Sequence, residues 1–316
     1  MNIVGLDEIV FGVDDIAGCT QFLTDYGLTP VGAGEHGGRF EAQDGTAVVI
    51  ARADDSTLPP ALATGCMLRK TVMGVADAAT LAAIADELGR DREVKQLADG
   101  AIETVDDSGF VIGFQLSVRK AVTTPGELSN APGAALQRAA NHLGVDVDAV
   151  IRPRSLSHIV YFVPDVQKAE AFYVERLGFR CTDRFAELGP FIQPAGTLDH
   201  HSHFLIGMPA HMQGVEHFTF HFAGPSEVMQ HGNRFLEKGY QPFWGPGRHI
   251  LGSNWFWYFN SPFGCHIEMD ADMDLHDDSW QPRVTNVGAD TSQAFLLQYR
   301  KKWAPGPGCP ENGAYA

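Results

Sequence analysis

The feature that most limits the fold of this chain is an internal repeat with a spacing of 150 residues. Residues 6–15, LDEIVFGVDD, align with residues 156–165, LSHIVYFVPD. In both copies the segment leads into a helix-like stretch that ends at a glycine, Gly27 or Gly178. A repeat of this length predicts two similar domains in tandem.

Each half of the chain divides again into two units of one helix and several strands. The prediction rests on alternating apolar runs that are bounded by Gly, Pro or Asn. In the second half we expect strands at 157–163, 203–206, 215–222, 255–259 and 265–269, and helices at 166–176 and 225–238. In the first half we expect strands at 9–13, 47–51, 71–75 and 111–116, and helices at 17–26 and 77–88. Asp77 is the expected N-cap of the last of these helices. The fold class is therefore α+β, with tandem βαβββ modules in two similar domains.

The predicted domain boundaries follow the repeat and the composition. We expect an N-terminal domain at 1–120, a linker at 121–154, a second domain at 155–270 and a C-terminal extension at 271–316. The linker is rich in Ala, Pro, Gly and Asn and is expected to contain a short helix at 134–142. The end of the extension, residues 305–316, is rich in Gly and Pro and is expected to fray.

Composition excludes several classes of function. The formal net charge is −16, which argues against a nucleic-acid partner because such proteins need a basic face. No apolar run reaches the roughly 20 residues that span a bilayer, so we expect no membrane association. The five cysteines are scattered, with no CxxC pair, and the N-terminus does not resemble a signal peptide. These features favour a cytoplasmic protein.

Histidines are concentrated in the second half of the chain. Of the thirteen, eleven lie between His158 and His276, where an even spread would place about five. For any single histidine, a surface position or a hydrogen-bonded core position is the simpler interpretation. The concentration nevertheless points to the second half as the site of chemistry.

Two histidines and one glutamate on predicted strands form the metal-ligand set that the sequence favours. These are His158, His217 and Glu268. Two imidazoles and one carboxylate on one face of Fe(II) leave adjacent positions open for a substrate and O2. Glu268 lies between Ile267 and Met269, where burial of a carboxylate is costly unless it is paired or bound to metal.

The internal repeat provides a comparison for this ligand set. At the matching positions the first half has Glu8, the segment 68–70 and Gly113. The scaffold therefore occurs twice and the ligand set once. This asymmetry favours one metal site, in the second domain, and an N-terminal domain without metal.

Three motifs carry a resemblance to a known family. They are GRH at 247–249, YFNSPFGCHIE at 258–268 and HHS at 200–202. With the ligand set, these motifs resemble those of the type I extradiol ring-cleavage (catechol) dioxygenases of the vicinal oxygen chelate superfamily. The likeness covers roughly residues 3–270 and is strongest from Ser157 onward.

The resemblance implies a function and roles for individual residues. It implies that Fe(II), or Mn(II) in its place, is the cofactor, and that a small aromatic diol and O2 are the reactants, with a yellow semialdehyde or dienoate as product. His201 would lie beside the O2 position and supply a proton. His249 and Tyr258 would bind the substrate oxygens and assist deprotonation. The family also suggests a homo-oligomer.

Two departures from the family pattern bear on the substrate. His158 is followed by Ile159 and Val160, where some relatives have a polar residue. Upstream of His249 the loop reads Phe243-Trp244, where enzymes for carboxylated catechols tend to have a basic residue. Both differences favour an apolar substituent on the ring.

Other functions and roles stay open at this point. The scaffold also serves glyoxalase-like isomerases, hydroxyphenylpyruvate-type dioxygenases and non-catalytic ligand-binding proteins, so the fold alone does not decide function. Tyr258, which has aromatic neighbours, could instead be a core residue. The remaining histidines of the second half are expected to support the ligands or the fold (His200, His203, His221, His266) or to lie on the surface (His211, His231, His276).

Overall fold

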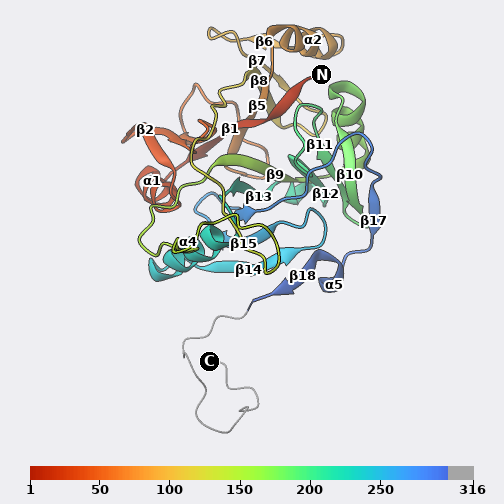
Figure 1. The fold of residues 1–316 in the computed structure, drawn as a ribbon. Coiled ribbons are helices and arrows are strands. Elements are labelled where there is room, and N and C mark those ends of the chain that lie inside the picture. Colours follow the sequence, from red (N-terminus) through yellow and green to blue (C-terminus); the bar gives the residue numbers. More distant parts are fainter. Residues whose placement is uncertain (298–316) are drawn as a thin grey trace.

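The computed structural model describes residues 1–297. Their fold is centred on two mixed β-sheets (Figure 1). The first sheet has eight strands in the order β2-β3-β4-β1-β5-β8-β7-β6. The second has ten, in the order β17-β10-β11-β12-β9-β13-β16-β15-β14-β18. No helix in the described part of the chain is both long enough and apolar enough to cross a membrane.

The first half consists of two consecutive βαβββ units. Their elements are β1 (Ile3–Val13), α1 (Ile16–Asp25), β2 (Thr29–Gly34), β3 (Gly37–Glu41), β4 (Ala47–Arg52), β5 (Leu68–Val75), α2 (Ala78–Leu88), β6 (Lys95–Gln96), β7 (Ile102–Val105) and β8 (Val111–Leu116). The Asp77 carboxylate accepts a hydrogen bond of 2.7 Å from the Thr80 amide, so its predicted role as the N-cap of α2 is confirmed.

The second half repeats this order. Its elements are β9 (Ser155–Val163), α3 (Val166–Ala171), a π-helical turn (Phe172–Arg176), β10 (Arg180–Phe185), β11 (Gly189–Gln193), β12 (His203–Gly207), a 3-10 turn (Ala210–Met212), β13 (Gly214–His221), α4 (Pro225–Glu237), β14 (Pro242–His249), β15 (Trp255–Asn260) and β16 (His266–Ala271). The predicted α+β class with tandem βαβββ modules is confirmed.

The segment after β16 adds to the second sheet. It forms β17 (Arg283–Thr285), α5 (Ala289–Ser292) and β18 (Gln293–Leu296), and the two strands lie at opposite edges of the sheet. The predicted fraying of residues 305–316 lies outside the described residues. The domain boundaries themselves stay a prediction.

The predicted linker helix at 134–142 is wrong. The segment forms turns and bends instead of a helix. Two of its backbone amides donate to a side chain and not to a helical carbonyl. The Asn130 side-chain oxygen accepts hydrogen bonds from the amides of Gln137 and Arg138, at 3.0 and 2.8 Å. A side chain that captures backbone amides in this way competes with helix formation.

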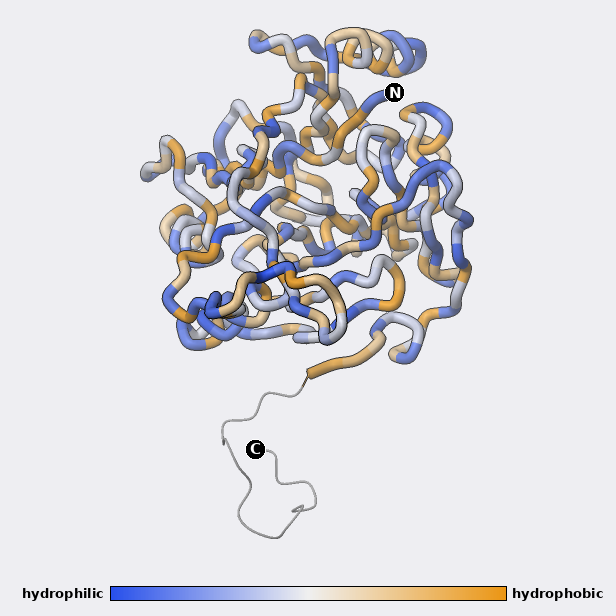
Figure 2. Tube along the Cα trace, in the orientation of Figure 1, coloured by the Kyte–Doolittle hydropathy of each residue, from blue (hydrophilic) through white to orange (hydrophobic). Residues whose placement is uncertain are grey.

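The two sheets share one hydrophobic core. Phe11 of β1 stacks on Phe263 and packs against Phe218 of β13. The Tyr26 hydroxyl, at the end of α1, donates to the backbone carbonyl of Glu268 at 2.5 Å. Hydrophobic and hydrophilic stretches alternate along the chain (Figure 2), as expected of elements with one buried and one exposed face. Through the hydrogen bond from Tyr26, the N-terminal half supports β16, the strand that carries Glu268.

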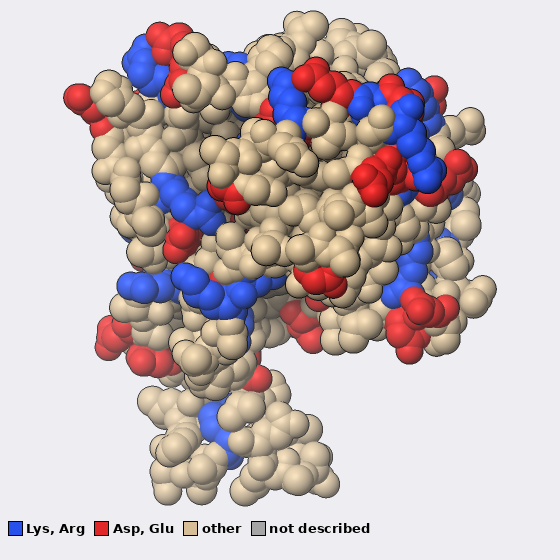
Figure 3. Space-filling model, turned by 90° about the horizontal axis from the view of Figure 1, so that it is seen from above, with Lys and Arg blue, Asp and Glu red and all other residues tan. Residues whose placement is uncertain are grey.

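Charged side chains of both signs are interspersed on the surface. On the face seen from above, acidic and basic groups alternate rather than separate into large patches (Figure 3). Many of them form ion pairs, such as Arg176 of the second half with Glu87 and Asp91 of the first. The net negative charge is thus spread over the molecule.

Candidate metal centre

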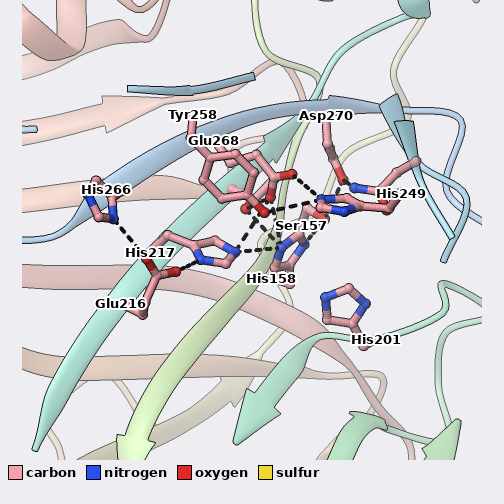
Figure 4. Close-up of polar contacts among 12 residues, drawn as sticks. Ser157, His158, His201, Glu216, His217, His249, Tyr258, His266, Glu268 and Asp270 are labelled. Atoms are coloured by element: carbon pink, nitrogen blue, oxygen red, sulfur yellow. Dashed lines mark hydrogen bonds and ion pairs between the residues drawn. The ribbon is translucent and has the colours of Figure 1, made fainter. Parts of the chain in front are cut away.

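The three predicted ligands lie on neighbouring strands and point toward one point (Figure 4). β9 pairs antiparallel with β13, and β13 pairs parallel with β16, which places Thr219 beside Glu268. The Nε2 atom of His158 lies 3.2 Å from Nε2 of His217 and 3.1 Å from Oε2 of Glu268. The distance from Nε2 of His217 to Oε2 of Glu268 is 3.6 Å. These side chains come together because alternate residues of a strand face the same side.

The hydrogen bonds on the far side of each imidazole fix which nitrogen faces the centre. Nδ1 of His158 lies 2.9 Å from the Ser157 hydroxyl, and Nδ1 of His217 contacts the Glu216 carboxylate. An ionised carboxylate only accepts, so Nδ1 of His217 carries the hydrogen and Nε2 presents its lone pair. A carboxylate behind a histidine is the usual support of a metal-bound imidazole.

The buried carboxylate of Glu268 also fits a cation. Burial raises the pKa of this group, but the neighbouring imidazoles of His158 and His249 outweigh it and hold the pKa well below its usual range. Oε2 accepts a hydrogen bond of 2.6 Å from the Thr219 hydroxyl. Within the described chain, Oε1 is buried without a hydrogen-bond partner. An unpaired buried carboxylate oxygen is costly, and a divalent ion would compensate it.

The three residues that the family resemblance implied surround this group. The ring of His201 lies beside that of His158, with 4.2 Å between centroids. The Tyr258 hydroxyl is 3.3 Å from Nε2 of His249, and the Tyr258 ring packs edge-on against His217 at 4.9 Å. Nε2 of His249 lies 3.5 Å from Oε1 of Glu268. All six predicted site residues are therefore brought together, and their functional roles stay predictions.

The sequence did not single out Glu216 and Thr219. Glu216 contacts His217 and also accepts a hydrogen bond from His266 at 2.8 Å. Burial raises the pKa of Glu216, but the charge of His217 and the hydrogen bonds from both histidines outweigh it and lower the pKa to about 2. Thr219 contacts both Glu268 and Nε2 of His158 (2.9 Å). Strand alternation does place Thr219 on the ligand face, two residues after His217. Glu216 had no such signal, because it is one acid among 39.

Two histidines that were expected at the surface are buried. His231 lies on the buried face of α4, where its Nε2 contacts the Tyr26 carbonyl oxygen at 2.9 Å. His276 stacks on Trp280 with 3.8 Å between ring centroids. Both are used in packing, and His211 is exposed as expected.

His221 and His266 contact the acids behind the ligands, Asp270 and Glu216, which agrees with their predicted supporting role.

Comparison with known proteins gives a family for the second half of the chain. Residues 155–269, which contain all three ligands, match the family described as the Glyoxalase/Bleomycin resistance protein/Dioxygenase superfamily. The part of the chain that carries the three candidate ligands therefore matches this superfamily. The resemblance inferred from the sequence is thereby confirmed.

Two curated relatives of similar sequence are named as a metapyrocatechase and as a dioxygenase of a biphenyl diol. Metapyrocatechase 2 of Cupriavidus necator is 38% identical over 151 residues, a match that spans 48% of this chain and only 45% of that relative. Biphenyl-2,3-diol 1,2-dioxygenase of Paraburkholderia xenovorans (strain LB400) is 28% identical over 303 residues, covering 89% of this chain and 91% of that protein.

Solved structures that are named for different activities share the fold of this chain. A Mn(II)-bound glyoxalase from Novosphingobium aromaticivorans has a TM-score of 0.72 at 21% identity, covering 92% of this chain and 90% of that one. A halotolerant catechol dioxygenase also has a TM-score of 0.72, at 16% identity, covering 94% of both chains. The shared fold therefore does not distinguish the two activities, and the side chains at the site must.

Proposed function

We propose that this chain is an Fe(II)-dependent extradiol dioxygenase that cleaves the ring of a catechol-type aromatic diol with O2. The observation that carries the proposal is the set of three proton-handling side chains around the ligands: His201, His249 and Tyr258. The names of the two curated relatives agree with it. When bound, Fe(II) would hold the diol and O2 next to each other and exchange electrons between them.

Tyr258 and His249 are placed to bind and deprotonate a substrate hydroxyl. Burial, followed by the charge of Glu268, raises the pKa of Tyr258 well above its usual value, so its hydroxyl stays protonated and can donate. Nδ1 of His249 donates to the Ser292 carbonyl at 3.0 Å, which leaves Nε2 as an acceptor on the side of Glu268. The pair thus offers a donor and an acceptor to one substrate oxygen.

His201 is placed to hold a second proton. Burial lowers its pKa well below 6.5, so the free side chain is neutral. Among residues 1–297, its Nε2 atom has no hydrogen-bond partner, whereas Nδ1 contacts His200 at 2.9 Å. We expect Nε2 to take a proton that a substrate hydroxyl releases and to return it later in the reaction.

The surroundings of the site favour a ring with an apolar substituent. A second hydrophobic cluster lies next to the ligands and consists of Val160, Phe185, Phe191, Phe204, Ile206 and Leu251. Phe191 packs edge-on against His201 at 5.0 Å. Arg248 is paired with Asp272 at 2.8 Å, which offsets the positive charge that a carboxylated ring would need. An aryl or alkyl catechol therefore fits better than an acidic one.

A glyoxalase-like reaction is the second candidate, because a Mn(II)-bound glyoxalase has an equal TM-score. That chemistry gives no role to the Tyr258–His249 pair. Location in the cytoplasm and assembly as a homo-oligomer stay predictions.

The test is O2 uptake by the full chain after anaerobic loading with Fe(II) or Mn(II). Catechol, 3-methylcatechol and 2,3-dihydroxybiphenyl are the substrates. We expect uptake matched one-to-one by a yellow product, with higher kcat/KM for the substituted rings. The metal that supports turnover identifies the cofactor. Metal-loaded protein that consumes no O2 with any of the three would contradict the proposal and favour the glyoxalase-like alternative.

A further inference from the structure

His201 is one end of a hydrogen-bonded chain that leads away from the metal ligands. Its Nδ1 atom lies 2.9 Å from Nδ1 of His200, and Nε2 of His200 lies 2.8 Å from Oδ2 of Asp183. His200 and Asp183 are completely buried. Among residues 1–297, neither is hydrogen-bonded to His158, His217 or Glu268, so the pair reaches the site through His201.

Asp183 is held in place by an arginine from beyond the second βαβββ unit. Arg283 of β17 approaches the carboxylate with its backbone amide (2.9 Å to Oδ1), Nε (3.0 Å to Oδ1) and Nη2 (2.5 Å to Oδ2). β17 also pairs with β10, with Arg283 beside Asp183. Burial raises the pKa of Asp183, but hydrogen bonds from His200 and Arg283 outweigh it and lower the pKa to about 2.

The chain determines which nitrogen of His201 carries a hydrogen. An ionised Asp183 only accepts, so Nε2 of His200 must donate to it. When this is the one hydrogen on the His200 ring, Nδ1 of His200 is an acceptor, and Nδ1 of His201 donates to it. This leaves the lone pair of His201 on Nε2, the nitrogen without a protein partner. A carboxylate that selects the tautomer of a catalytic histidine has a large effect on rate in serine proteases.

We propose that Asp183, His200 and Arg283 are positioning residues that fix the ring orientation and the tautomer of His201. The inference rests on the proposed role of His201 as the proton-handling residue. The first sheet lacks this arrangement: counting along the strand registers, Val31 and Gly45 stand where the second sheet has Asp183 and His200. The scaffold therefore does not need the chain of hydrogen bonds, and β17 gains a role in the site.

The test is the Asp183→Asn variant of the full-length, Fe(II)-loaded enzyme, alone and combined with His201→Ala. Because the backbone amide and Nε of Arg283 both donate to the Oδ1 position, the asparagine oxygen would stay there, and its NH2 group would face His200 and donate to it. His200 would then donate to His201, and Nε2 of His201 would carry the hydrogen instead. We expect kcat for ring cleavage to fall about 10–100-fold, with KM and iron content unchanged.

The double variant separates positioning from a general structural role. If Asp183 acts through His201, Asp183→Asn should change kcat by less than about 2-fold in the His201→Ala background. An equal loss in both backgrounds, or wild-type kcat in Asp183→Asn, would overturn the proposal. Asp44→Asn is the matched control, because Asp44 is also buried and paired with an arginine, Arg119 at 3.1 Å. It should leave kcat unchanged.

Two further measurements keep the outcome clear. If Asp183→Asn does not fold, His200→Phe removes the acceptor for His201 while Asp183 keeps its arginine, and the same coupled loss of kcat is expected. Nitrogen-15 NMR of the Zn(II)-loaded full chain reports the His201 tautomer without turnover. Hydrogen on Nδ1 in the wild type and on Nε2 in Asp183→Asn supports the inference even if the wild type cleaves no catechol. An unchanged tautomer refutes it independently of the proposed function.

Discussion

The N-terminal and C-terminal sheets place different side chains at equivalent points of the same strand arrangement. β1 pairs antiparallel with β5, and β5 pairs parallel with β8, just as β9 pairs with β13 and β13 with β16. Counting along these registers places Glu8, Lys70 and Gly113 where the second sheet has its three metal-ligand candidates. Backbone pairing of this kind is thus compatible with very different side chains.

The N-terminal positions are satisfied without an ion. Glu8 pairs with Arg39 at 2.9 Å, and Lys70 pairs with Glu103 at 3.1 Å, both near the sheet surface. In the second sheet, by contrast, two imidazoles and a carboxylate meet in a buried position with one carboxylate oxygen unpaired. Among residues 1–297, this is the one group of His, Cys, Asp and Glu that could hold a metal. The comparison teaches that the fold does not require these three side chains. Metal binding is the explanation that we propose for them.

The largest expected effect is that of Glu268→Ala, which should abolish metal retention and activity together. Removing the single anionic ligand leaves two neutral imidazoles, which hold a divalent ion poorly. Elemental analysis after gel filtration measures the metal content. Glu8→Ala in the other sheet is the matched control and should retain the full metal content. Metal retained by Glu268→Ala, or lost from Glu8→Ala, would break the comparison between the sheets.

The next effect is that of His201→Ala, which should keep metal and substrate binding but reduce kcat about 10²–10⁴-fold. The loss is expected in kcat because His201 is not a ligand and would act on a proton in the reaction. Thr46 is its counterpart in the first sheet by strand register. Thr46→Ala should leave kcat as in the wild type. Full ring-cleavage activity in His201→Ala would remove this residue from the mechanism.

The central strands and the six site residues could be predicted because their patterns are local. Val111–Leu116, for example, coincides with β8, since a run of apolar residues bounded by polar ones defines a buried strand. The edge strands escaped prediction. β2, at the edge of the first sheet, is exposed along its whole length. β14, which lies next to the edge strand β18, was also missed because it contains the sequence GPG, which is typical of a turn. Burial decides the pattern of a strand, and edge strands have little of it.

Contacts between distant parts of the chain could not be predicted from one sequence. Asp183 and Arg283 are 100 residues apart, and no local pattern links them. The same holds for Tyr26 and the carbonyl of Glu268, which are 242 residues apart. The ligand residues were recognisable by their chemical type, whereas the residues that position them are ordinary acids, hydroxyls and arginines whose role depends on where the chain folds.

A third effect concerns stability, and it should be confined to one sheet. Metal binds the folded state only, so at 100 times the Kd it should stabilise the protein by about 2.7 kcal/mol. Hydrogen exchange followed by mass spectrometry should show added protection in β9, β13 and β16 after metal loading. The equivalent strands β1, β5 and β8 should change little, because their side chains are paired without an ion. Equal protection of both sheets would mean that metal acts on the whole fold.

The smallest effect compares two buried aspartates, one in each half. Asp106 accepts from the amides of Ser108 and Phe110 and from the Tyr173 hydroxyl, but burial dominates and raises its pKa from 3.8 to about 6. The folded state therefore holds this proton between pH 3.8 and about 6, where the unfolded state has released it. Asp106 thus makes the protein less stable as pH rises through this window, and the penalty is complete above pH 6.

Asp106→Asn should remove that penalty, because the amide resembles the protonated carboxyl. We expect a gain of about 1–2 kcal/mol in the free energy of unfolding at pH 8 and little change at pH 4. Asp183→Asn should do the reverse at pH 8, since the pKa of Asp183 is lowered to about 2 by His200 and Arg283, and its ionised form stabilises the fold above pH 3.8. Urea unfolding at the two pH values measures both variants. If both variants changed the free energy of unfolding in the same direction at pH 8, Arg283 would not be the cause of the opposite pKa shifts of Asp183 and Asp106.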